Sequence, residues 1–289
     1  MAALMVPSGF GSIAAPLDDE AYYLLNELLE ERFGLHFPSP RRSVLETRLQ
    51  HRLRALHLDD FLEYYAYLRS NGTDESRELA KAITNNETYF FRERDQLDAL
   101  FGEGLASLAA TPAVPGRIRL LSAGCSSGEE AYTLSFLAAD HAAGRAIPVE
   151  IDGLDLDSDR VASAQRAEYR VRSLRQMTDE QIRRYLAPAA APERWTVREP
   201  YRRTVRFDFG NLVDGSCFRR RPLYDAVFCR NVLIYFSAAS MRRAIENLVS
   251  VLRPGGLLFL GHSESAIGLL PQLQATRLGG CIVYRKVAR

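Results

Sequence analysis

The chain has 289 residues, of which 47% are hydrophobic and 25% are charged. These values predict a globular protein of one large or two moderate domains that bury an ordinary hydrophobic core. The net charge of +1 argues against a surface built mainly to bind nucleic acid. No apolar stretch is long enough to cross a bilayer, and the first residues lack the basic start of a signal peptide. We therefore expect a cytoplasmic protein that does not insert into membranes.

Cysteine and histidine usage gives no sign of a metal site. The four cysteines are scattered and form no Cys-x-x-Cys pair, and the five histidines are not clustered. This usage predicts reduced thiols rather than a disulfide framework or a zinc site. We expect no bound metal.

The first part of the chain is predicted to be helical. After a short mobile tail at residues 1–16, residues 17–84 have the caps and apolar spacing of an all-helical domain. A linker follows at residues 85–116 and contains a connecting helix over about residues 93–110. The helices expected in the domain run from Asp18 or Asp19 to residue 32, and over residues 40–56, 59–69 and 75–83.

Residues 117–289 form a second predicted domain, in which strands alternate with helices. This rhythm predicts a mostly parallel sheet covered on both faces, closed by an antiparallel hairpin about Gly279-Gly280. A small α/β insertion is expected at about residues 171–203, with a capping box of Thr178 and Gln181 and a short β segment at 195–203. The strands are expected at residues 118–123, 149–156, 204–209, 224–229 and 257–261.

The junction after the first of these strands carries the most informative motif, Ser122-Ala-Gly-Cys-Ser-Ser-Gly-Glu-Glu130. Small residues at a strand-to-helix turn let a ligand touch the backbone. A P-loop would need Lys-Ser/Thr after Gly128, and a dinucleotide fingerprint would need a glycine where Ser126 stands. S-adenosylmethionine fits better, because it carries a sulfonium and no phosphate. Together with the strand pattern, this predicts an α/β, Rossmann-like, class I S-adenosylmethionine-dependent methyltransferase fold preceded by a small all-helical domain.

The second predicted strand ends in acids, at Asp155, Asp157 and Asp159. An acid at this position is where a nucleoside-binding sheet holds ribose hydroxyls. Two of the three acids can instead cap the helix that starts near Ser158. We expect Asp155 to be the ribose ligand.

Three further segments complete the pattern. They are Thr84-Asn-Asn-Glu-Thr-Tyr-Phe-Phe-Arg92, Phe209-Gly-Asn-Leu212 and Tyr224-Asp-Ala-Val-Phe-Cys-Arg-Asn-Val-Leu-Ile-Tyr-Phe236, the last followed by Val251-Leu-Arg-Pro-Gly-Gly-Leu257 and Leu260-Gly-His-Ser-Glu264. Over about residues 20–286 the chain resembles the chemotaxis receptor glutamate methyltransferases, the CheR family. The resemblance implies methyl transfer from S-adenosylmethionine to glutamates in the cytoplasmic helical region of chemoreceptors. The products would be glutamyl methyl esters, made in sensory adaptation, and S-adenosylhomocysteine.

The resemblance also implies particular site residues. Arg92 and Tyr235 are expected to flank the methyl group, where Arg92 can hold an incoming carboxylate through charge-assisted hydrogen bonds. A glutamate has a pKa near ~4.3 and arrives ionised, so no general base such as His262 is required. The implied cofactor contacts are Asn86, Thr88, Arg92, Glu130 (preferred over Glu129), Asp155, Asn211, Leu212, Arg230 and Asn231.

The predicted helix at residues 40–56 carries a basic stripe. Arg41, Arg48 and Arg52 fall together at about 100° per residue, beside a face of leucines. We expect the leucines to pack inward and the arginines to point outward. A solvated helix face is the simpler interpretation, but the resemblance favours binding to a glutamate-rich receptor helix.

Two other functions fit the same fold. One is a nucleic-acid methyltransferase, against which the near-neutral charge and the lack of an Asn/Asp-Pro-Pro-Tyr motif count. The other is a non-catalytic, cofactor-binding signalling scaffold, which the presence of Arg92 and Tyr235 makes less attractive. The segment at 195–203 lacks the Gly-rich loop of relatives that bind a receptor tail, so we expect tail-independent action. We also expect a monomer.

Overall fold

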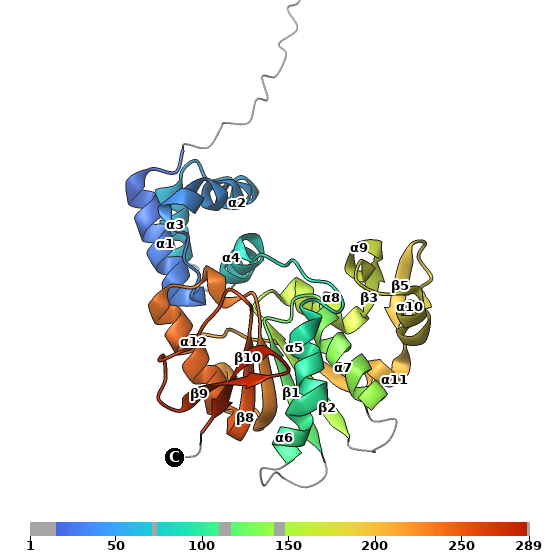
Figure 1. The fold of residues 1–289 in the computed structure, drawn as a ribbon. Coiled ribbons are helices and arrows are strands. Elements are labelled where there is room, and N and C mark those ends of the chain that lie inside the picture. Colours follow the sequence, from blue (N-terminus) through green and yellow to red (C-terminus); the bar gives the residue numbers. More distant parts are fainter. Residues whose placement is uncertain (1–15, 71–73, 110–116, 142–147, 288–289) are drawn as a thin grey trace, which may run out of the picture. The chain divides into compact units, whose positions relative to one another are not determined.

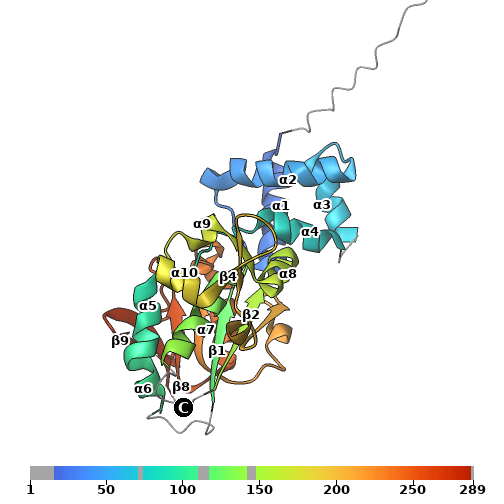
Figure 2. The same ribbon diagram turned by 90° about the vertical axis from the view of Figure 1, so that its right-hand side faces the viewer.

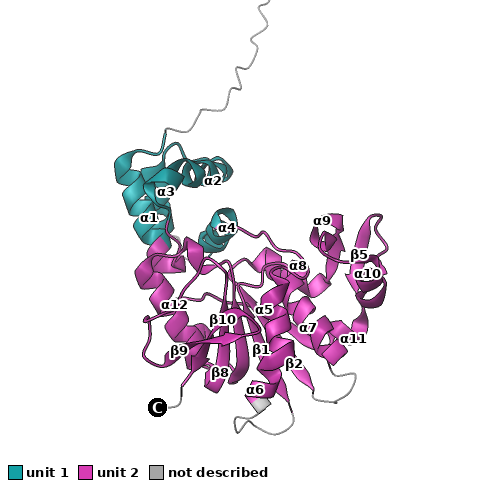
Figure 3. Cartoon of the chain, in the orientation of Figure 1, with its two compact units in different colours: residues 1–29, 37–83 teal, residues 30–36, 84–289 magenta. Residues whose placement is uncertain are grey.

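The computed structural model describes residues 16–70, 74–109, 117–141 and 148–287 (Figure 1). Nearly all of the predicted tail at 1–16 and the end of the predicted linker, at 110–116, lie outside these residues. The chain divides into two compact units, one of residues 1–29 and 37–83 and the other of residues 30–36 and 84–289 (Figure 3).

The first unit is helical, as predicted. Asp18 begins the first helix by accepting a hydrogen bond of 2.8 Å from the backbone N–H of Ala21. Leu45, Leu49 and Leu53 repeat every four residues on the second helix and are fully buried, which makes them the core face of that helix. The elements are α1 (Asp19–Phe33), the 3₁₀ turn η1 (Ser39–Arg41), α2 (Arg42–Leu56), α3 (Phe61–Ser70) and α4 (Asp74–Ile83).

The second unit is built on a seven-stranded sheet in the order β6-β2-β1-β7-β8-β10-β9 (Figures 1 and 2). The first five strands in this order are parallel, and β10 is antiparallel to both of its neighbours. The predicted five parallel strands closed by an antiparallel pair are therefore confirmed. The strands are β1 (Ile118–Ala123), β2 (Val149–Asp155), β6 (Val205–Phe209), β7 (Tyr224–Cys229), β8 (Leu252–Leu260), β9 (Leu273–Leu278) and β10 (Cys281–Lys286).

Helices cover both faces of this sheet. Leu120 and Leu121, neighbours on β1 and both fully buried, belong to two different apolar clusters, because successive strand residues point to opposite faces. One cluster includes residues of α7 (Glu129–His141) and α8 (Ser158–Arg166), and the other includes residues of α12 (Ala238–Ser250). The chain runs from β1 to β2 on one side, and β7 pairs on the other side of β1. The loops after β1 and β7 therefore flank the crevice where such sheets bind ligands.

The connecting helix predicted at 93–110 is interrupted. It consists of α5 (Arg94–Ala99), a five-residue π-helical turn (Leu100–Gly104) and α6 (Leu105–Ala109). The turn contains Gly102 and Gly104, two residues that weaken an α-helix.

The insertion before β6 is a small three-stranded sheet, in the order β3-β5-β4, with short helices. The predicted capping box of Thr178 and Gln181 is present. The predicted β segment at 195–203 is only partly correct, because the strand ends at Val197 and Pro200 lies in the first turn of a helix, a position that suits proline. The elements are β3 (Glu168–Arg170), α9 (Val171–Leu174), α10 (Asp179–Tyr185), β4 (Leu186–Pro188), β5 (Arg194–Val197) and α11 (Glu199–Arg202). Within the residues that the structure describes, no helix has the length and apolar character needed to span a membrane.

Candidate active site

The loop after β1 has an unusual backbone. Gly124, Ser126 and Gly128 all have positive φ angles, of 78°, 48° and 90°. A Cβ on Gly124 would lie 2.4 Å from Cγ2 of Val232, which follows β7, so the β1 and β7 loops touch at this point. Only glycine tolerates both the left-handed conformation and this close approach.

Asp155 ends β2 beside this loop and is buried, with 7% of its surface exposed. One carboxylate oxygen accepts a hydrogen bond of 2.7 Å from the N–H of Ser126. The other accepts a hydrogen bond of 2.9 Å from the N–H of Asp157. Burial raises the pKa of Asp155 to about 6 despite these hydrogen bonds. Each oxygen keeps a second lone pair, which suits an acceptor of ribose hydroxyls.

Asp157 has the capping role left open for it. Its Oδ1 accepts from the N–H groups of Asp159 and Arg160 at the start of α8. Its Oδ2 accepts 2.9 Å from the side chain of Asn86. The carbonyl of Asn86 in turn accepts from the hydroxyl of Ser126, at 3.3 Å. Asn86, in the predicted motif of residues 84–92, thus lies against the loops that follow β1 and β2.

The two glutamates of the loop motif have different surroundings. Glu129 is 2% exposed and accepts from the hydroxyls of Ser127 and Ser173, and burial raises its pKa. Glu130 accepts two hydrogen bonds of 2.7 Å, one from the hydroxyl of Ser122 and one from Nε of Arg230. Glu129 therefore holds the insertion to the loop, while Glu130 lies towards β7.

Arg230 is buried and forms hydrogen bonds with three groups. Its side chain is 2% exposed, and besides Glu130 it donates to the backbone carbonyls of Arg92 (2.9 Å) and Glu93 (3.0 Å). The side chain of Glu93 accepts 3.0 Å from Asn231, which has a φ of 59°. Arg230 and Asn231 thus connect the end of β7 to the predicted motif at Arg92.

Tyr235 is held from two sides. Its phenol oxygen accepts a hydrogen bond of 2.6 Å from the side-chain amide of Asn85. The loop that carries it is fixed by Glu264, whose carboxylate accepts from the N–H groups of Asn231, Ile234 and Gly261 at 3.1, 3.2 and 2.7 Å. Burial raises the pKa of Glu264. Sequence reasoning named neither Asn85 nor Glu264 as a site residue, although the motifs containing them were quoted.

The remaining predicted cofactor residues lie at the edges of this group. Arg92 is half-buried, and its guanidinium donates a hydrogen bond of 2.7 Å to the carbonyl of Glu87. Thr88 is also half-buried. Asn211 follows β6, but its side-chain amide already donates a hydrogen bond of 2.6 Å to the carbonyl of Arg32. Its side-chain oxygen accepts a hydrogen bond from the N–H of Val213. Its side chain therefore shapes the turn. Leu212, 6% exposed, offers an apolar surface beside it.

The arginine stripe of α2 is not oriented as predicted. Arg41 is exposed, but Arg48 lies over the ring of Phe37 and donates to the carbonyl of Ile83. Arg52 donates two hydrogen bonds, of 2.9 and 2.7 Å, to Glu75. Glu75 is 5% exposed, and a buried carboxylate needs such a partner, which draws Arg52 inward. The expected outward orientation of Arg48 and Arg52 was wrong, and the substrate role of the three arginines stays a prediction.

His262 lies between two carboxylates, with Nε2 3.1 Å from Asp95 and Nδ1 3.6 Å from Glu93. Its side chain is about half exposed. Among the described residues, no three His, Cys, Asp or Glu side chains gather in a way that could hold a metal ion.

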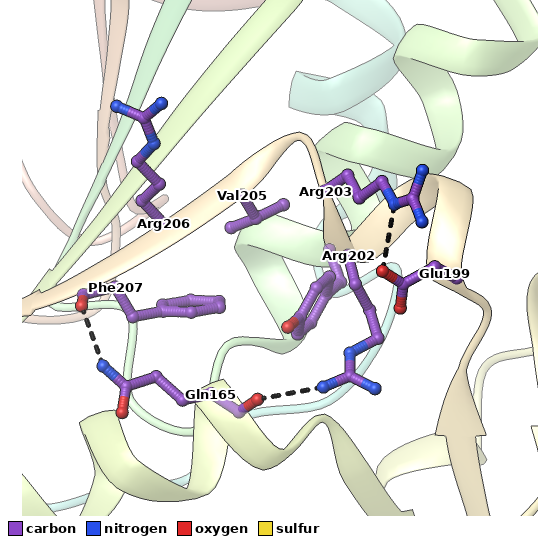
Figure 4. A pocket seen from close by; sticks show the side chains of 8 residues that line it. Gln165, Glu199, Arg202, Arg203, Val205, Arg206 and Phe207 are labelled. Carbon is purple, nitrogen blue, oxygen red and sulfur yellow. Dashed lines mark hydrogen bonds and ion pairs between the residues drawn. The ribbon is translucent and has the colours of Figure 1, made fainter.

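A cavity of about 410 Å³ lies beside the edge strand β6 (Figure 4). Arg202 points towards the carbonyl of Gln165, whose amide donates 3.1 Å to the carbonyl of Phe207. Arg203 is paired with Glu199 at 3.0 Å. The cavity shares no residue with the predicted site, so we do not count it as part of that site. Its lining residues are Tyr132, Gln165, Glu199, Arg202, Arg203, Val205, Arg206 and Phe207.

Two family descriptions match the chain in sequence. Residues 86–276 match the S-adenosylmethionine-binding domain of CheR methyltransferases, and residues 20–84 match their all-alpha domain. The chain belongs to the CheR methyltransferase family.

Individual methyltransferases are also similar to the chain in sequence. A chemotaxis protein methyltransferase of Vibrio cholerae is 32% identical over 252 residues, which is 86% of either chain. One from Salmonella typhimurium is 31% identical over 271 residues, covering 93% of this chain and 90% of that relative. A probable biofilm formation methyltransferase, WspC of Pseudomonas aeruginosa, is 34% identical over 265 residues, covering 90% of this chain and 61% of WspC.

The chemistry of the CheR site fits S-adenosylmethionine. The guanidinium of Arg230, which follows β7, is bonded to Glu130 and two carbonyls and is therefore not available to a phosphate. Glu130 lies in the first turn of α7, after β1, and Asp155 ends the neighbouring strand β2; their carboxylates favour a ligand with a cationic centre and hydroxyl donors. The residues present are thus better suited to a sulfonium nucleoside than to a nucleotide.

Proposed function

We propose that this CheR-family methyltransferase esterifies glutamate side chains of chemoreceptors, with S-adenosylmethionine as the methyl donor. The observation that carries the proposal is the path of residues 85–93. Hydrogen bonds join Asn86 to the ends of β1 and β2, Asn85 to Tyr235 after β7, and the carbonyl of Arg92 to Arg230. These hydrogen bonds support a site in which Arg92 and Tyr235 serve the same end of the sheet as Asp155. The names of the relatives support chemoreceptors as the substrate.

The mechanism asks for positioning rather than for a base. When bound, S-adenosylmethionine supplies a methyl group on a positive sulfur. Arg92 holds the ionised glutamate of the substrate, whose pKa near ~4.3 leaves it unprotonated at neutral pH. Tyr235, fixed by Asn85, forms a wall at the reacting atoms. The contribution of the protein is in-line placement and exclusion of water.

The site residues follow the same proposal. Asp155 binds the ribose, the segment after β6 with Asn211 and Leu212 binds the adenine, and residues 86–92 with Glu130, Arg230 and Asn231 surround the amino-acid end. The helical domain at 17–84 recognises the receptor, and the enzyme works as a cytoplasmic monomer without binding nucleic acid.

Purified enzyme, S-adenosylmethionine with a tritiated methyl group and a cytoplasmic chemoreceptor fragment test this proposal. Arg92→Ala and Tyr235→Phe should lower kcat more than they weaken S-adenosylhomocysteine binding, because their contacts are strongest at the transferring methyl. A variant with wild-type kcat would show that its residue is structural. The kcat profile should have no limb near neutral pH that His262→Ala abolishes. Label appearing in nuclease-sensitive material would favour a nucleic-acid substrate, and no transfer at all would favour a scaffold.

A further inference from the structure

The insertion is bonded directly to the predicted site. The N–H of Phe90 donates 3.0 Å to the carbonyl of Ser173 in α9, and the hydroxyl of Ser173 donates 2.8 Å to Glu129 at the start of α7. Phe90 itself is fully buried and stacks against Phe136 of α7. Residues just after α9 are therefore held at a fixed position relative to the segment that leads to Arg92.

Arg175, the residue that follows α9, lies over the ring of Tyr89. Its guanidinium carbon is 3.7 Å from the ring centroid, and that of Arg92 is 5.7 Å from the same centroid. Arg175 is also paired with the carboxylate of Glu87 at 3.0 Å, while Arg92 donates to the backbone carbonyl of Glu87. Two guanidinium groups thus lie over one aromatic ring, whose face attracts both cations.

The pair of Arg175 and Glu87 is open to water. Their side chains are 33% and 53% exposed, and an exposed pair of this kind is held by only about 0.2–1 kcal/mol. Another carboxylate can therefore replace Glu87 at little cost. The adjoining surface of α9 suits an acidic partner, because Arg170 and Arg172 are exposed on either side of Val171, which is 59% exposed.

We propose that Arg175 is a substrate-binding residue: it takes a second acidic side chain of the protein substrate, in place of Glu87, while Arg92 holds the glutamate to be methylated. This inference rests on the proposed function. Side chains three or four residues apart on a helix have Cβ atoms about 5–6 Å apart. The guanidinium carbons of Arg175 and Arg92 lie 3.7 and 5.7 Å from the same ring centroid, so two carboxylates one helical turn apart can each reach one of them. Arg175 therefore selects glutamates that have an acidic neighbour one helical turn away.

The test measures kcat and KM for a chemoreceptor cytoplasmic fragment, with S-adenosylhomocysteine affinity measured by calorimetry. Arg175→Ala should raise the KM about fivefold, the size expected of a half-exposed charge pair, and leave kcat and cofactor affinity unchanged. Arg183→Ala, which removes an exposed arginine from α10 of the same insertion, is the matched control and should leave the KM unchanged.

Glu87→Gln separates substrate binding from bracing of the loop. If Arg175 binds the substrate, Glu87→Gln removes a competitor and should not raise the KM. If Arg175 only braces residues 87–92 through Glu87, both variants would raise the KM alike, and the inference would be overturned. A wild-type KM in Arg175→Ala would overturn it too, while leaving the proposed function intact. Absence of methyl transfer by the wild type would instead defeat the proposed function, and this inference with it.

Discussion

S-adenosylhomocysteine should bind less tightly as the pH falls through 6, because Asp155 must then lose a proton to bind it. The carboxyl group is 7% exposed, and burial raises its pKa to about 6. Its oxygens already accept from the N–H groups of Ser126 and Asp157, so only the ionised form has lone pairs for both ribose hydroxyls. In the free protein this raised pKa means that ionisation of Asp155 costs folding stability between about pH 4 and 6. Two hydroxyl donors would offset that cost.

The expected size follows from the pKa. With a pKa of about 6, the carboxyl group of Asp155 is roughly one-tenth ionised at pH 5 and nine-tenths ionised at pH 7. If only the ionised form binds, the dissociation constant should rise about tenfold from pH 7 to pH 5, equivalent to about 1.4 kcal/mol. At pH 5, binding should release close to one proton, and at pH 7 only about one-tenth of a proton.

Calorimetry at pH 5, 6 and 7, in buffers of different ionisation enthalpy, measures both quantities. Asp155→Asn should bind S-adenosylhomocysteine more weakly at pH 7 and show no dependence on pH, because one hydroxyl loses its acceptor and the titrating group is gone. Asp159→Asn removes an exposed acid nearby and is the matched control. A wild-type dissociation constant that stays the same from pH 5 to 7, or a pH dependence that survives in Asp155→Asn, would refute the reasoning.

Two further predictions concern the carboxylates of Glu75 and Glu264. Arg52→Met should lower the free energy of unfolding by about 3 kcal/mol in urea denaturation, because it leaves the 5%-exposed carboxylate of Glu75 without its cation. The control is Arg54→Met, at an exposed position of the same helix, which should change the free energy of unfolding little. Equal effects of the two substitutions would contradict this explanation. Glu264→Ala should lower kcat at least tenfold, roughly the cost of one lost charge-assisted contact, because three backbone N–H groups of the loop that carries Tyr235 lose their acceptor. Unchanged turnover in that variant would show that the loop is positioned by other contacts.

The sheet could be predicted from the sequence because its signals are local. The runs at 118–123 and 224–229 are short and apolar and end in small or polar residues, and the observed strands have the same bounds. The capping box at Thr178 is likewise contained in four residues. Strand β8 begins at Leu252 rather than at 257, because Pro254 and the two glycines after it hide the extended conformation.

The site could be predicted only in part, because its decisive contacts join residues far apart in the chain. Periodicity placed Arg52 on the edge of a leucine face, but its inward orientation depends on Glu75 in another helix. The phenol of Tyr235 depends in the same way on Asn85, and its loop depends on Glu264. Sequence patterns list the side chains that are available, and tertiary packing decides which of them are used for the fold.

The nature of the transferred methyl group tests the central claim most directly. The enzyme is incubated with tritiated S-adenosylmethionine and a chemoreceptor cytoplasmic fragment, and the labelled fragment is then treated with mild alkali and, separately, mapped by mass spectrometry. A glutamyl methyl ester predicts that alkali releases the label as volatile methanol and that one methyl group maps to a glutamate in a helical segment. Alkali-stable label on lysine, arginine or nucleic acid would contradict the account.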